Sequence, residues 1–568
     1  MRYHALACDY DGTIATDGQV SESTINALEN VKKSGRKLLL VTGRELDDLL
    51  RVFHRIDLFD RVVAENGALL YRPANREEKL LAEASPPEFS RELIRRGATR
   101  VSIGRVIVAT WEPHETTAIQ VIRDMGLELQ VIFNKGAVMI LPSGVNKATG
   151  LCAALQELGL SPHNVVGVGD AENDHAFMGI CECSVAVANA LPMLKERVDW
   201  VTTYDHGKGV EELIDRLIAS DLSEFEDRLH SRIALGKRAD GSEIFVSPYG
   251  KNILIAGSSG SGKSTLATGF MERLEEQKYQ FVIIDPEGDY STFEAGVALG
   301  DEERAASVTE ILDVLAKPGE NAIVNLIAVG LKERPAFFES LFPRVQELRA
   351  QTGHPHWIVV DEAHHVLPAF WETAGITVSQ HMYSVLLVTL EPDKVAPAIL
   401  SSIDVVIAIG ENPDETLRIF SETVGEPAPK PTGLTLHPGE AVGWFRRISE
   451  PPFLFRSSLP RAERRRHRRK YAEGQLSDDL SFYFRGPEGK LNLKAQNLNM
   501  FLQLADGVDD ETWLFHLKNG DISGWFLNVI KDPELAAEAY RLEGADISGE
   551  QSRKEIRTHI EKRYILAA

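Results

Sequence analysis

Residues 8–13, CDYDGT, place two carboxylates directly after an apolar run. Asp9 and Asp11 would lie just past the end of a strand, where an open α/β sheet presents its ligand site. Two carboxylates this close repel each other unless a cation lies between them, and Mg²⁺ is a natural partner for oxygen ligands. Asp9 can then attack a phosphate as the nucleophile, while Asp11 protonates the leaving oxygen and later deprotonates a water. The stretch therefore predicts a magnesium-dependent phosphoryl-transfer site at the edge of an α/β sheet.

Three further stretches supply the other groups that such a site needs. Thr42 and Gly43 in VTGR end the next strand, where a hydroxyl and a free backbone N–H can hold phosphate oxygens. Lys147 in GVNKATG begins a helix and offers a positive charge to the phosphate and the nucleophile. GVGDAEND brings Asp170 and Asp174, four residues apart after another buried strand, as metal ligands or as groups that support them.

These four stretches appear in the order, and at the strand ends, of the haloacid dehalogenase (HAD) superfamily of phosphatases, which residues 1–222 resemble. Asn66, Gly67 and Ala68 after the third strand are typical of its Cof-type (IIB) branch. Residues from about 71 to 146, with the strands RVIVATW, ELQVIF and AVMILP, resemble the α/β cap of that branch. The resemblance implies a Rossmann-like core and a Mg²⁺-dependent phosphatase. It also implies a small substrate, such as a sugar phosphate or phosphoglycolate, because such caps close over small esters and exclude water.

A second phosphate-binding stretch, GSSGSGKST, follows the apolar run NILIA and precedes the helical segment LATGFMERLEEQ. This is the context of the P-loop motif, whose backbone N–H groups surround the phosphates of ATP. Lys263 would contact the terminal phosphates and Ser264 would bind Mg²⁺. The predicted ATP-binding residues are Gly257, Ser258, Ser259, Gly260, Ser261, Gly262, Lys263, Ser264 and Thr265.

The stretch HWIVVDEAHHVLP, residues 356–368, supplies the hydrolytic half of this second site. Asp361 follows an apolar strand and would hold the Mg²⁺ through water, and Glu362 would orient or deprotonate the attacking water. A carboxylate beside the metal and aimed at a water favours hydrolysis of ATP over transfer to another acceptor. His364 and His365 diverge on a helix, so we assign them structural or supporting roles rather than metal binding.

Residues 235–457 resemble the HerA/FtsK-type ATPases, a RecA-like branch that usually forms hexameric rings. DPEGDY at 285–290 is similar to the Asp-Pro-x-Gly-Glu-Tyr stretch of that family. The four residues DEAH at 361–364 are therefore interpreted as a ring-ATPase motif rather than a helicase box. The family usually ends the next strand with a Thr-Gln pair that senses the nucleotide, whereas this chain has Thr389 and Leu390. In a ring ATPase, the neighbouring subunit usually supplies an arginine to the nucleotide site. The candidates are Arg446, Arg447 and Arg456.

The chain of 568 residues is predicted to be an α/β multidomain protein, since one ordinary domain takes roughly 150 residues. Short apolar runs alternate with helical-period segments in two successive regions, which predicts two parallel α/β sheets. The expected parts are 1–222 for the phosphatase, 223–240 for a linker, 241–458 for the RecA-like P-loop ATPase, 459–475 for a basic linker and 476–568 for a small α-helical C-terminal domain.

The charges and cysteines limit the partners and the location. A net charge of −22 means that the molecule as a whole repels phosphate backbones, so any nucleic-acid site would be local. The segment from Arg461 to Lys470 holds seven Arg or Lys in ten positions. It could contact nucleic acid, but in so acidic a chain we prefer a solvated helix that pairs with acidic surface. Four cysteines, no signal peptide and no run of roughly 20 apolar residues predict a cytoplasmic protein without membrane contact.

Three hypotheses for the whole chain remain. We favour a bifunctional enzyme, in which a small-ester phosphatase is joined to an ATP-hydrolysing domain that assembles a homo-oligomeric ring, of hexameric size in that family. A second hypothesis is a nucleic-acid processing enzyme that combines an ATP-driven DNA or RNA translocase with an end phosphatase. The cap opposes it, since a closed lid admits a strand end poorly. A third is a nucleotide-operated scaffold or switch with slow ATP turnover.

Overall fold

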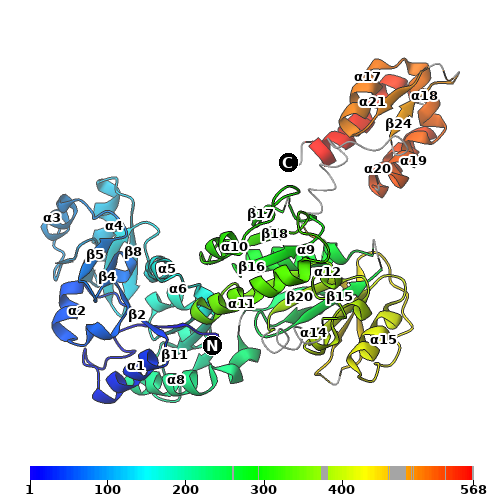
Figure 1. Cartoon of the computed structure of the whole chain (residues 1–568). Coiled ribbons are helices and arrows are strands. Elements are labelled where there is room, and N and C mark those ends of the chain that lie inside the picture. The colour runs from blue at the N-terminus through cyan, green and yellow to red at the C-terminus, as the bar shows by residue number, and fades with distance from the viewer. Residues whose placement is uncertain are drawn as a thin grey trace. The chain divides into compact units, whose positions relative to one another are not determined.

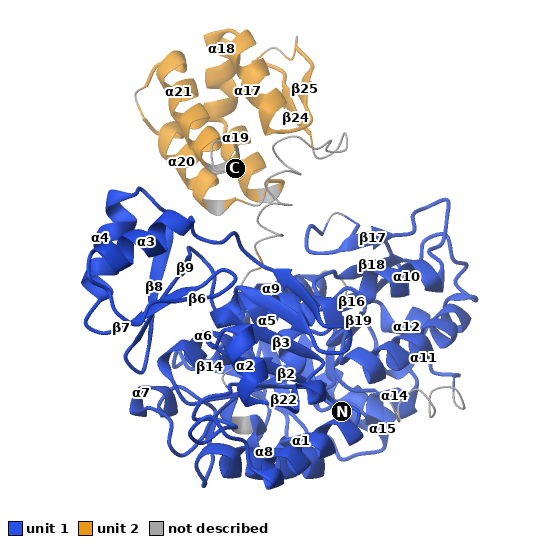
Figure 2. Ribbon diagram, turned by 90° about the vertical axis from the view of Figure 1, so that its left-hand side faces the viewer, with its two compact units in different colours: residues 1–458 blue, residues 459–568 orange. Residues whose placement is uncertain are grey.

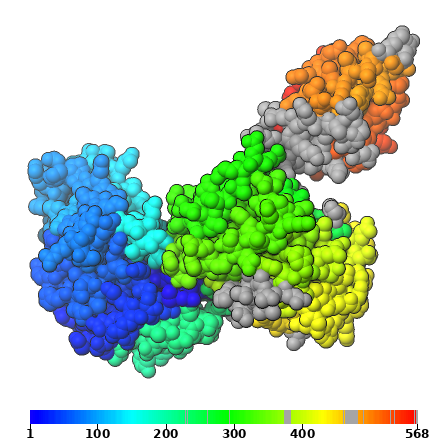
Figure 3. Space-filling model, viewed as in Figure 1, coloured from blue at the N-terminus to red at the C-terminus, as the bar shows by residue number. Residues whose placement is uncertain are grey.

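The computed structural model describes residues 1–229, 231–258, 261–291, 293–371, 382–448, 450–457, 460, 481–487, 489, 491–530, 532–545 and 547–565. The chain divides into two compact units, Met1–Ser458 and Leu459–Ala568 (Figure 2). The first unit contains two large α/β sheets and a small cap (Figure 1). Figure 3 shows the molecular surface from the same side. Among the residues in these ranges, no helix combines the length and the apolar character that a membrane span requires.

The first sheet has the strand order β12-β11-β10-β1-β2-β3-β4-β5. Its strands are β1 (Ala5–Cys8), β2 (Lys37–Val41), β3 (Arg61–Ala64), β4 (Leu69–Arg72), β5 (Glu77–Leu80), β10 (Val165–Gly169), β11 (Cys183–Ala186) and β12 (Trp200–Val201). Its helices are α1 (Glu22–Lys33), α2 (Leu46–Val52), α5 (Lys147–Leu158), α6 (His175–Met178), α7 (Pro192–Lys195) and α8 (His206–Ser220).

The central strands of this sheet are parallel, and their registers decide where the predicted site residues lie. Strand β1 is buried along its length and lies between β10 and β2, with Cys8 opposite both Val168 and Leu40. Because these strands run in the same direction, the residues that follow them meet at one carboxyl-terminal edge. Helix α5 begins at the same edge with a capping box, in which the Asn146 side chain accepts hydrogen bonds from the backbone of the first turn.

The cap is an antiparallel sheet of order β6-β7-β9-β8 with two helices. Its elements are α3 (Pro87–Arg95), β6 (Ser102–Ile103), β7 (Val108–Trp111), α4 (Glu115–Asp124), β8 (Leu129–Asn134) and β9 (Ala137–Pro142). The sequence predicts a cap that begins at about residue 71, but the hairpin of β4 and β5 pairs with β3 and extends the core sheet instead. The cap sheet proper starts only at Ser102, because β4 continues the backbone hydrogen bonding of β3.

The second sheet has the strand order β14-β13-β23-β22-β21-β15-β20-β19-β16-β18-β17. The parallel strands are β15 (Ile253–Gly257), β16 (Phe281–Asp285), β17 (Val297–Leu299), β18 (Ala322–Asn325), β19 (Trp357–Val360), β20 (Val385–Thr389) and β21 (Val405–Ile409). The antiparallel strands are β13 (Ile233–Lys237), β14 (Glu243–Val246), β22 (Glu440–Phe445) and β23 (Phe453–Ser457). The helices are α9 (Lys263–Glu276), α10 (Val308–Leu315), α11 (Arg334–Thr352), α12 (Ala363–Val366), α14 (Pro397–Ser401) and α15 (Pro413–Val424).

Two features of the second sheet differ from, or add to, the expected organisation. The predicted linker 223–240 contains a 3-10 helix, Ser223–Arg228, and then strand β13, which pairs with β23 in the sheet. The short apolar run of this strand stands among charged residues and Gly, which concealed it in the sequence. In addition, β20 lies between the strand that precedes the P-loop, β15, and the strand that precedes Asp361, β19.

The C-terminal unit is mainly helical in the residues that can be described. Its elements are β24 (Phe482–Phe484), β25 (Leu493–Ala495), α17 (Leu498–Gly507), α18 (Asp510–Lys518), α19 (Asp521–Asn528), α20 (Pro533–Glu543) and α21 (Gly549–Ile560). Its core is rich in aromatic rings, among them Phe482, Phe484, Phe501 and Trp513. The basic segment 461–470 lies outside the described residues, so the expectation for it stays a prediction.

Candidate functional site

A buried lysine lies between two carboxylates at the carboxyl-terminal edge of the first sheet. The Nζ atom of Lys147 donates to Oδ1 of Asp9 at 2.5 Å and to Oδ1 of Asp174 at 2.6 Å. Burial and the charge of Asp174 raise the pKa of Asp9 to about 8. Burial alone would lower the pKa of Lys147, but the charges of Asp174 and Asp9 raise it above its ordinary value. The lysine therefore stays charged and fixes both acids.

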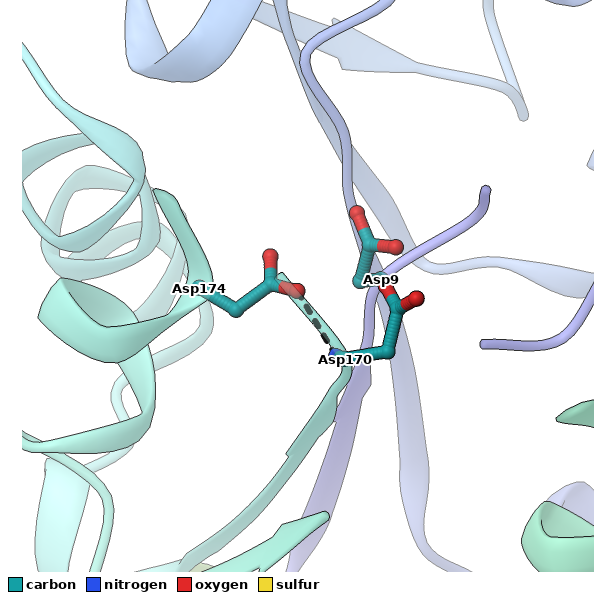
Figure 4. Close-up of side chains that lie close together, drawn as sticks. All are labelled: Asp9, Asp170 and Asp174. Atoms are coloured by element: carbon teal, nitrogen blue, oxygen red, sulfur yellow. Dashed lines mark hydrogen bonds between the residues drawn. The ribbon is translucent and has the colours of Figure 1, made fainter. Parts of the chain in front are cut away.

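The structure gives Asp174 a supporting position. Its Oδ2 atom accepts hydrogen bonds from the backbone N–H groups of Asp170 and Ala171, each at 2.9 Å, while Oδ1 holds Lys147. Both of its oxygens are thus engaged, whereas Lys147 takes only Oδ1 of Asp9. The side chains of Asp9 and Asp170 lie next to each other, with Asp174 directed toward them (Figure 4).

The acidic cluster suits Mg²⁺. Asp9, Asp170 and Asp174 each offer a buried oxygen, and these atoms lie within 4.8 Å of one another. Burial raises the pKa of both Asp9 and Asp170, so a bound cation would favour their ionised forms. Oxygen ligands in this number and at this spacing fit a hard divalent cation. Asp9 and Asp170 would hold the ion, and Asp174 would orient the loop that carries Asp170.

Asp11 does not join this cluster, although the sequence predicts it as a metal ligand. Its two carboxylate oxygens accept hydrogen bonds of 2.6 and 2.7 Å from the guanidinium of Arg44. The same arginine contacts Asp48, and its backbone N–H donates to Oγ1 of Thr42 at 3.1 Å. The physical reason is the fork geometry of arginine, which matches a carboxylate at two points. Asp11 and Thr42 thus lie at the predicted edge, with Arg44 between them.

Two residues near this site escaped the sequence prediction. Lys135 lies between β8 and β9 at the tip of the cap hairpin, and its Nζ donates to Oδ2 of Asp170. Glu65, which is fully buried, accepts hydrogen bonds from the backbone N–H groups of Arg105, Val106 and Ile107 in the cap at 2.7, 2.8 and 3.0 Å. In the sequence, Lys135 stands out only as a single cation in a tight Asn-Lys-Gly turn. For Glu65, the positive φ of 51° that it adopts is invisible in the sequence.

The P-loop residues lie between β15 and α9, as the motif requires. A side chain at Gly257 would meet the carbonyl oxygen of Ile409 at 1.9 Å, so only glycine fits there. Lys263, which is almost completely buried, donates from Nζ to the carbonyl of Ser258 at 2.9 Å. Burial lowers the pKa of this lysine. Ser261, Gly262, Ser264 and Thr265 lie at or next to the start of α9, whereas Ser259 and Gly260 lie outside the described residues.

Asp361 and Glu362 follow β19 on the other side of β20. Burial raises the pKa of Asp361 to about 7. Glu362 adopts a left-handed φ of 38°, and its Oε2 atom is buried with no hydrogen-bond partner among the described residues. Nδ1 of His364 lies 3.4 Å from that oxygen and 3.3 Å from Oγ1 of Thr389. This histidine therefore connects the proposed catalytic glutamate to the position expected to sense the nucleotide.

Asp285 shapes the adjoining DPEGDY stretch. Its carboxylate accepts hydrogen bonds from the backbone N–H groups of Gly288, Asp289 and Tyr290 at 2.8, 3.1 and 2.9 Å. The stretch therefore folds back as a turn at the end of β16.

Three arginines were considered as the residue that a neighbouring subunit would use. Of these, Arg446 forms an ion pair with Glu426 at 2.6 Å.

The two α/β cores contact each other through the amino-terminal edges of their sheets. His163 and Asn164 precede β10 in the first core. Nε2 of His163 lies 2.7 Å from the carbonyl oxygen of Gln277, and Nε2 of His356 lies 3.3 Å from Oδ1 of Asn164. Gln277 and His356 precede β16 and β19 of the second core. Because both candidate sites lie at the carboxyl ends of these strands, each site opens on the side of its sheet away from the contact.

Comparison with known proteins agrees with this architecture. Residues 6–97 and 113–214 match the family of haloacid dehalogenase-like hydrolases, and residues 235–316 match the central domain of helicase HerA. The N-terminal part is 32% identical over 222 residues to a phosphoglycolate phosphatase of Methanothermobacter thermautotrophicus, covering 38% of this chain and 98% of that protein. It is 30% identical over 230 residues to phosphoglycolate phosphatase 2 of Saccharolobus solfataricus, covering 39% of this chain and 95% of that protein.

The chain belongs to the haloacid dehalogenase-like hydrolases and carries a HerA-type domain in the same polypeptide. Both resemblances seen in the sequence are thereby confirmed. The N-terminal part is a phosphatase of this family.

Proposed function

We propose that the chain is a Mg²⁺-dependent phosphatase of small phosphate esters joined to an ATP-hydrolysing domain. The observation that carries the first half is the buried set of Asp9, Lys147 and Asp174, with Asp170 beside it. Bound Mg²⁺ would screen the charges of the phosphate and the nucleophile. Phosphoglycolate is our preferred substrate, because the relatives that align over nearly their full length bear that name.

The residues divide the chemistry between them. Asp9 attacks phosphorus from the position that Lys147 fixes, and an aspartyl phosphate forms as the ester oxygen leaves. Asp11 gives that oxygen a proton, then takes one from the water that hydrolyses the aspartyl phosphate. For this, Asp11 must exchange its contact with Arg44 for the substrate and the water. Thr42 and the backbone at Gly43 would hold the other phosphate oxygens.

The cap supports a small substrate. A side chain built at Gly43 would lie 2.8 Å from Cε of Met139 in the cap, so the cap sheet lies directly over the phosphate-binding turn. Lys135 of the same cap lies against Asp170. A cap packed this closely against the turn favours a short ester, which would be shielded from water during transfer.

The second half of the proposal concerns ATP. The P-loop geometry around Lys263 and the unpartnered Glu362 carboxylate beside Asp361 support ATP binding and hydrolysis. We further propose that this domain assembles copies of the chain into a ring, which the match to the HerA central domain favours. Light scattering with and without ATP would test the assembly.

Phosphate release from the purified chain tests both activities. The panel comprises phosphoglycolate, sugar phosphates, nucleotides and ATP, each with and without Mg²⁺. Asp9→Asn should abolish ester hydrolysis and leave ATP hydrolysis intact, whereas Lys263→Ala should do the reverse. Glu362→Gln should still bind ATP yet hydrolyse it at least about 100-fold more slowly. If either single change removed both activities, the two sites would not be independent.

A further inference from the structure

Lys135 is a cap residue that reaches the reaction centre of the core. It lies at the tip of the hairpin of β8 and β9 with a φ of 48°, followed by Gly136 with a φ of 85°. The two residues form the whole connection between the strands, which is the geometry of a tight two-residue hairpin turn. Its Nζ donates to Asp170, and a side chain at Gly12 would lie 2.7 Å from that nitrogen.

The charges around Lys135 change when the site is filled. When all three are ionised, Asp9, Asp170 and Asp174 bring three negative charges together, and Lys147 offsets one of them. In the structure Lys135 supplies a further positive charge through Asp170. A divalent cation held by Asp9 and Asp170 balances the cluster without help from Lys135. The ammonium group would then lie beside the reaction site with a positive charge available to the substrate.

We propose that Lys135 selects the substrate by binding a second anionic group, a carboxylate one or two carbons from the phosphate. The inference rests on the proposed phosphatase function and deepens it. In the structure Lys135 pairs with Asp170, and with Mg²⁺ and substrate bound it would turn from Asp170 to the substrate carboxylate. The side chain is 46% exposed and has four rotatable bonds, so this movement needs no change in the backbone.

Lys135 is therefore a specificity residue and also a competitor of the metal. A charge-assisted hydrogen bond of this kind is worth roughly 10- to 100-fold in affinity. Esters with a neutral tail, such as glycerol phosphate or p-nitrophenyl phosphate, gain nothing from it. Arginine keeps the charge at this position but has a bulkier planar head, so it should restore only part of the selectivity.

The test compares wild type, Lys135→Met and Lys135→Arg in the full-length chain. Lys135→Met should raise KM for phosphoglycolate at least about 10-fold, with kcat and the constants for p-nitrophenyl phosphate within about twofold of wild type. Lys135→Arg should recover part of the loss. Lys37→Met is the matched control, because Lys37 is 47% exposed and paired with Asp60 at the opposite edge of the sheet. Equal effects of Lys135→Met on both esters, or none, would overturn the proposal.

Calorimetric titration with Mg²⁺ in the absence of substrate gives a readout that does not depend on turnover. Lys135→Met should bind Mg²⁺ at least about threefold more tightly than wild type, since Asp170 no longer has a competing cation. Unchanged or weaker binding would contradict the exchange at Asp170. If wild type hydrolysed no ester, the proposed function would fail, and this titration would still decide whether Lys135 and the metal compete.

Discussion

The hydroxyl of Tyr279 in the HerA-type core donates a hydrogen bond of 2.7 Å to Oε2 of Glu182 in the phosphatase core. Glu182 is only 1% exposed and also accepts from Arg2 at 2.5 Å, with Nδ1 of His163 at 2.7 Å. The rings of His163 and Tyr279 stack with their centroids 3.8 Å apart. Burial would raise the pKa of Glu182, but His163 and Arg2 outweigh it and the net pKa is lowered. One buried carboxylate thus joins the two halves.

Glu182→Ala should weaken this contact strongly. The change removes the nearest carboxylate of the buried Arg2 and leaves Glu226 at 3.8 Å, and breaking a buried pair costs about 3–5 kcal/mol in other proteins. Scanning calorimetry should then show separate unfolding of the two cores where wild type unfolds as one unit. Glu157→Ala is the control, because Glu157 pairs with Arg61 and Arg72 inside the phosphatase core alone. If both variants gave the same unfolding profile, Glu182 would have no special role between the cores.

Acid should weaken the same contact through His356. Its Nδ1 accepts from the backbone N–H of Gln280 at 2.8 Å and its Nε2 faces Oδ1 of Asn164, so the neutral ring satisfies both partners. Burial, with the nearby charge of His163, lowers its pKa well below 6.5. As pH falls below 6.5, His356 binds a proton in the unfolded chain but not in the folded chain, so the free energy of unfolding decreases.

Urea unfolding at pH 7.5, 6 and 5 measures this effect. His356→Asn keeps an acceptor for Gln280 but cannot titrate, so its stability should fall less over this range than that of wild type. The difference between the two proteins isolates His356 from other titrating groups. Parallel pH dependences would show that His356 contributes nothing.

Magnesium affinity should rise with pH through the pKa of Asp9. Burial raises that pKa to about 8, so a proton must leave before the carboxylate can bind a cation. Calorimetry at pH 6.5 in buffers of different ionisation enthalpy should reveal release of about one proton per Mg²⁺ bound. Asp9→Asn should bind Mg²⁺ more weakly and with little proton release. Affinity that does not change between pH 6 and 9 would refute the prediction.

Glu65→Gln should loosen the cap. The carboxylate has two oxygens that accept three backbone N–H groups of the cap, whereas glutamine offers one acceptor and a donor that faces those groups. Amide exchange at residues 105–107 should accelerate by roughly 10-fold or more, as expected for about 1.5–3 kcal/mol. Glu78→Gln is the control, since Glu78 contacts only the guanidinium of Arg105. Unchanged exchange in Glu65→Gln would argue against this role for Glu65.

The residues at strand ends could be predicted because a parallel sheet brings its carboxyl ends together whatever lies between. Asp9, Thr42, Lys147 and Asp170 therefore lie at one edge, as the motifs indicate. Lys135 could not be found in this way, since its approach depends on how the cap packs on the core. Nothing in the sequence indicated that Asp11 pairs with Arg44 and lies outside the acidic cluster.

The contact between the cores lay beyond prediction for a different reason. Glu182, Tyr279 and His356 are single polar residues in loops before strands, and no periodic pattern distinguishes them from solvated loop residues. Strand β13 was missed because its short apolar alternation lies among charges and Gly. Such features depend on surfaces that exist only after the two sheets have formed.

The edge-to-edge joining of the two sheets also limits what the fusion can achieve. Phosphate or product that leaves one pocket emerges on the far side from the other pocket and mixes with bulk water before it could arrive there. Within one chain, an intermediate would therefore have to pass through solvent to reach the other site. The covalent connection keeps the two cores in a fixed one-to-one ratio. The packed contact between them also allows a conformational change in one core to affect the other.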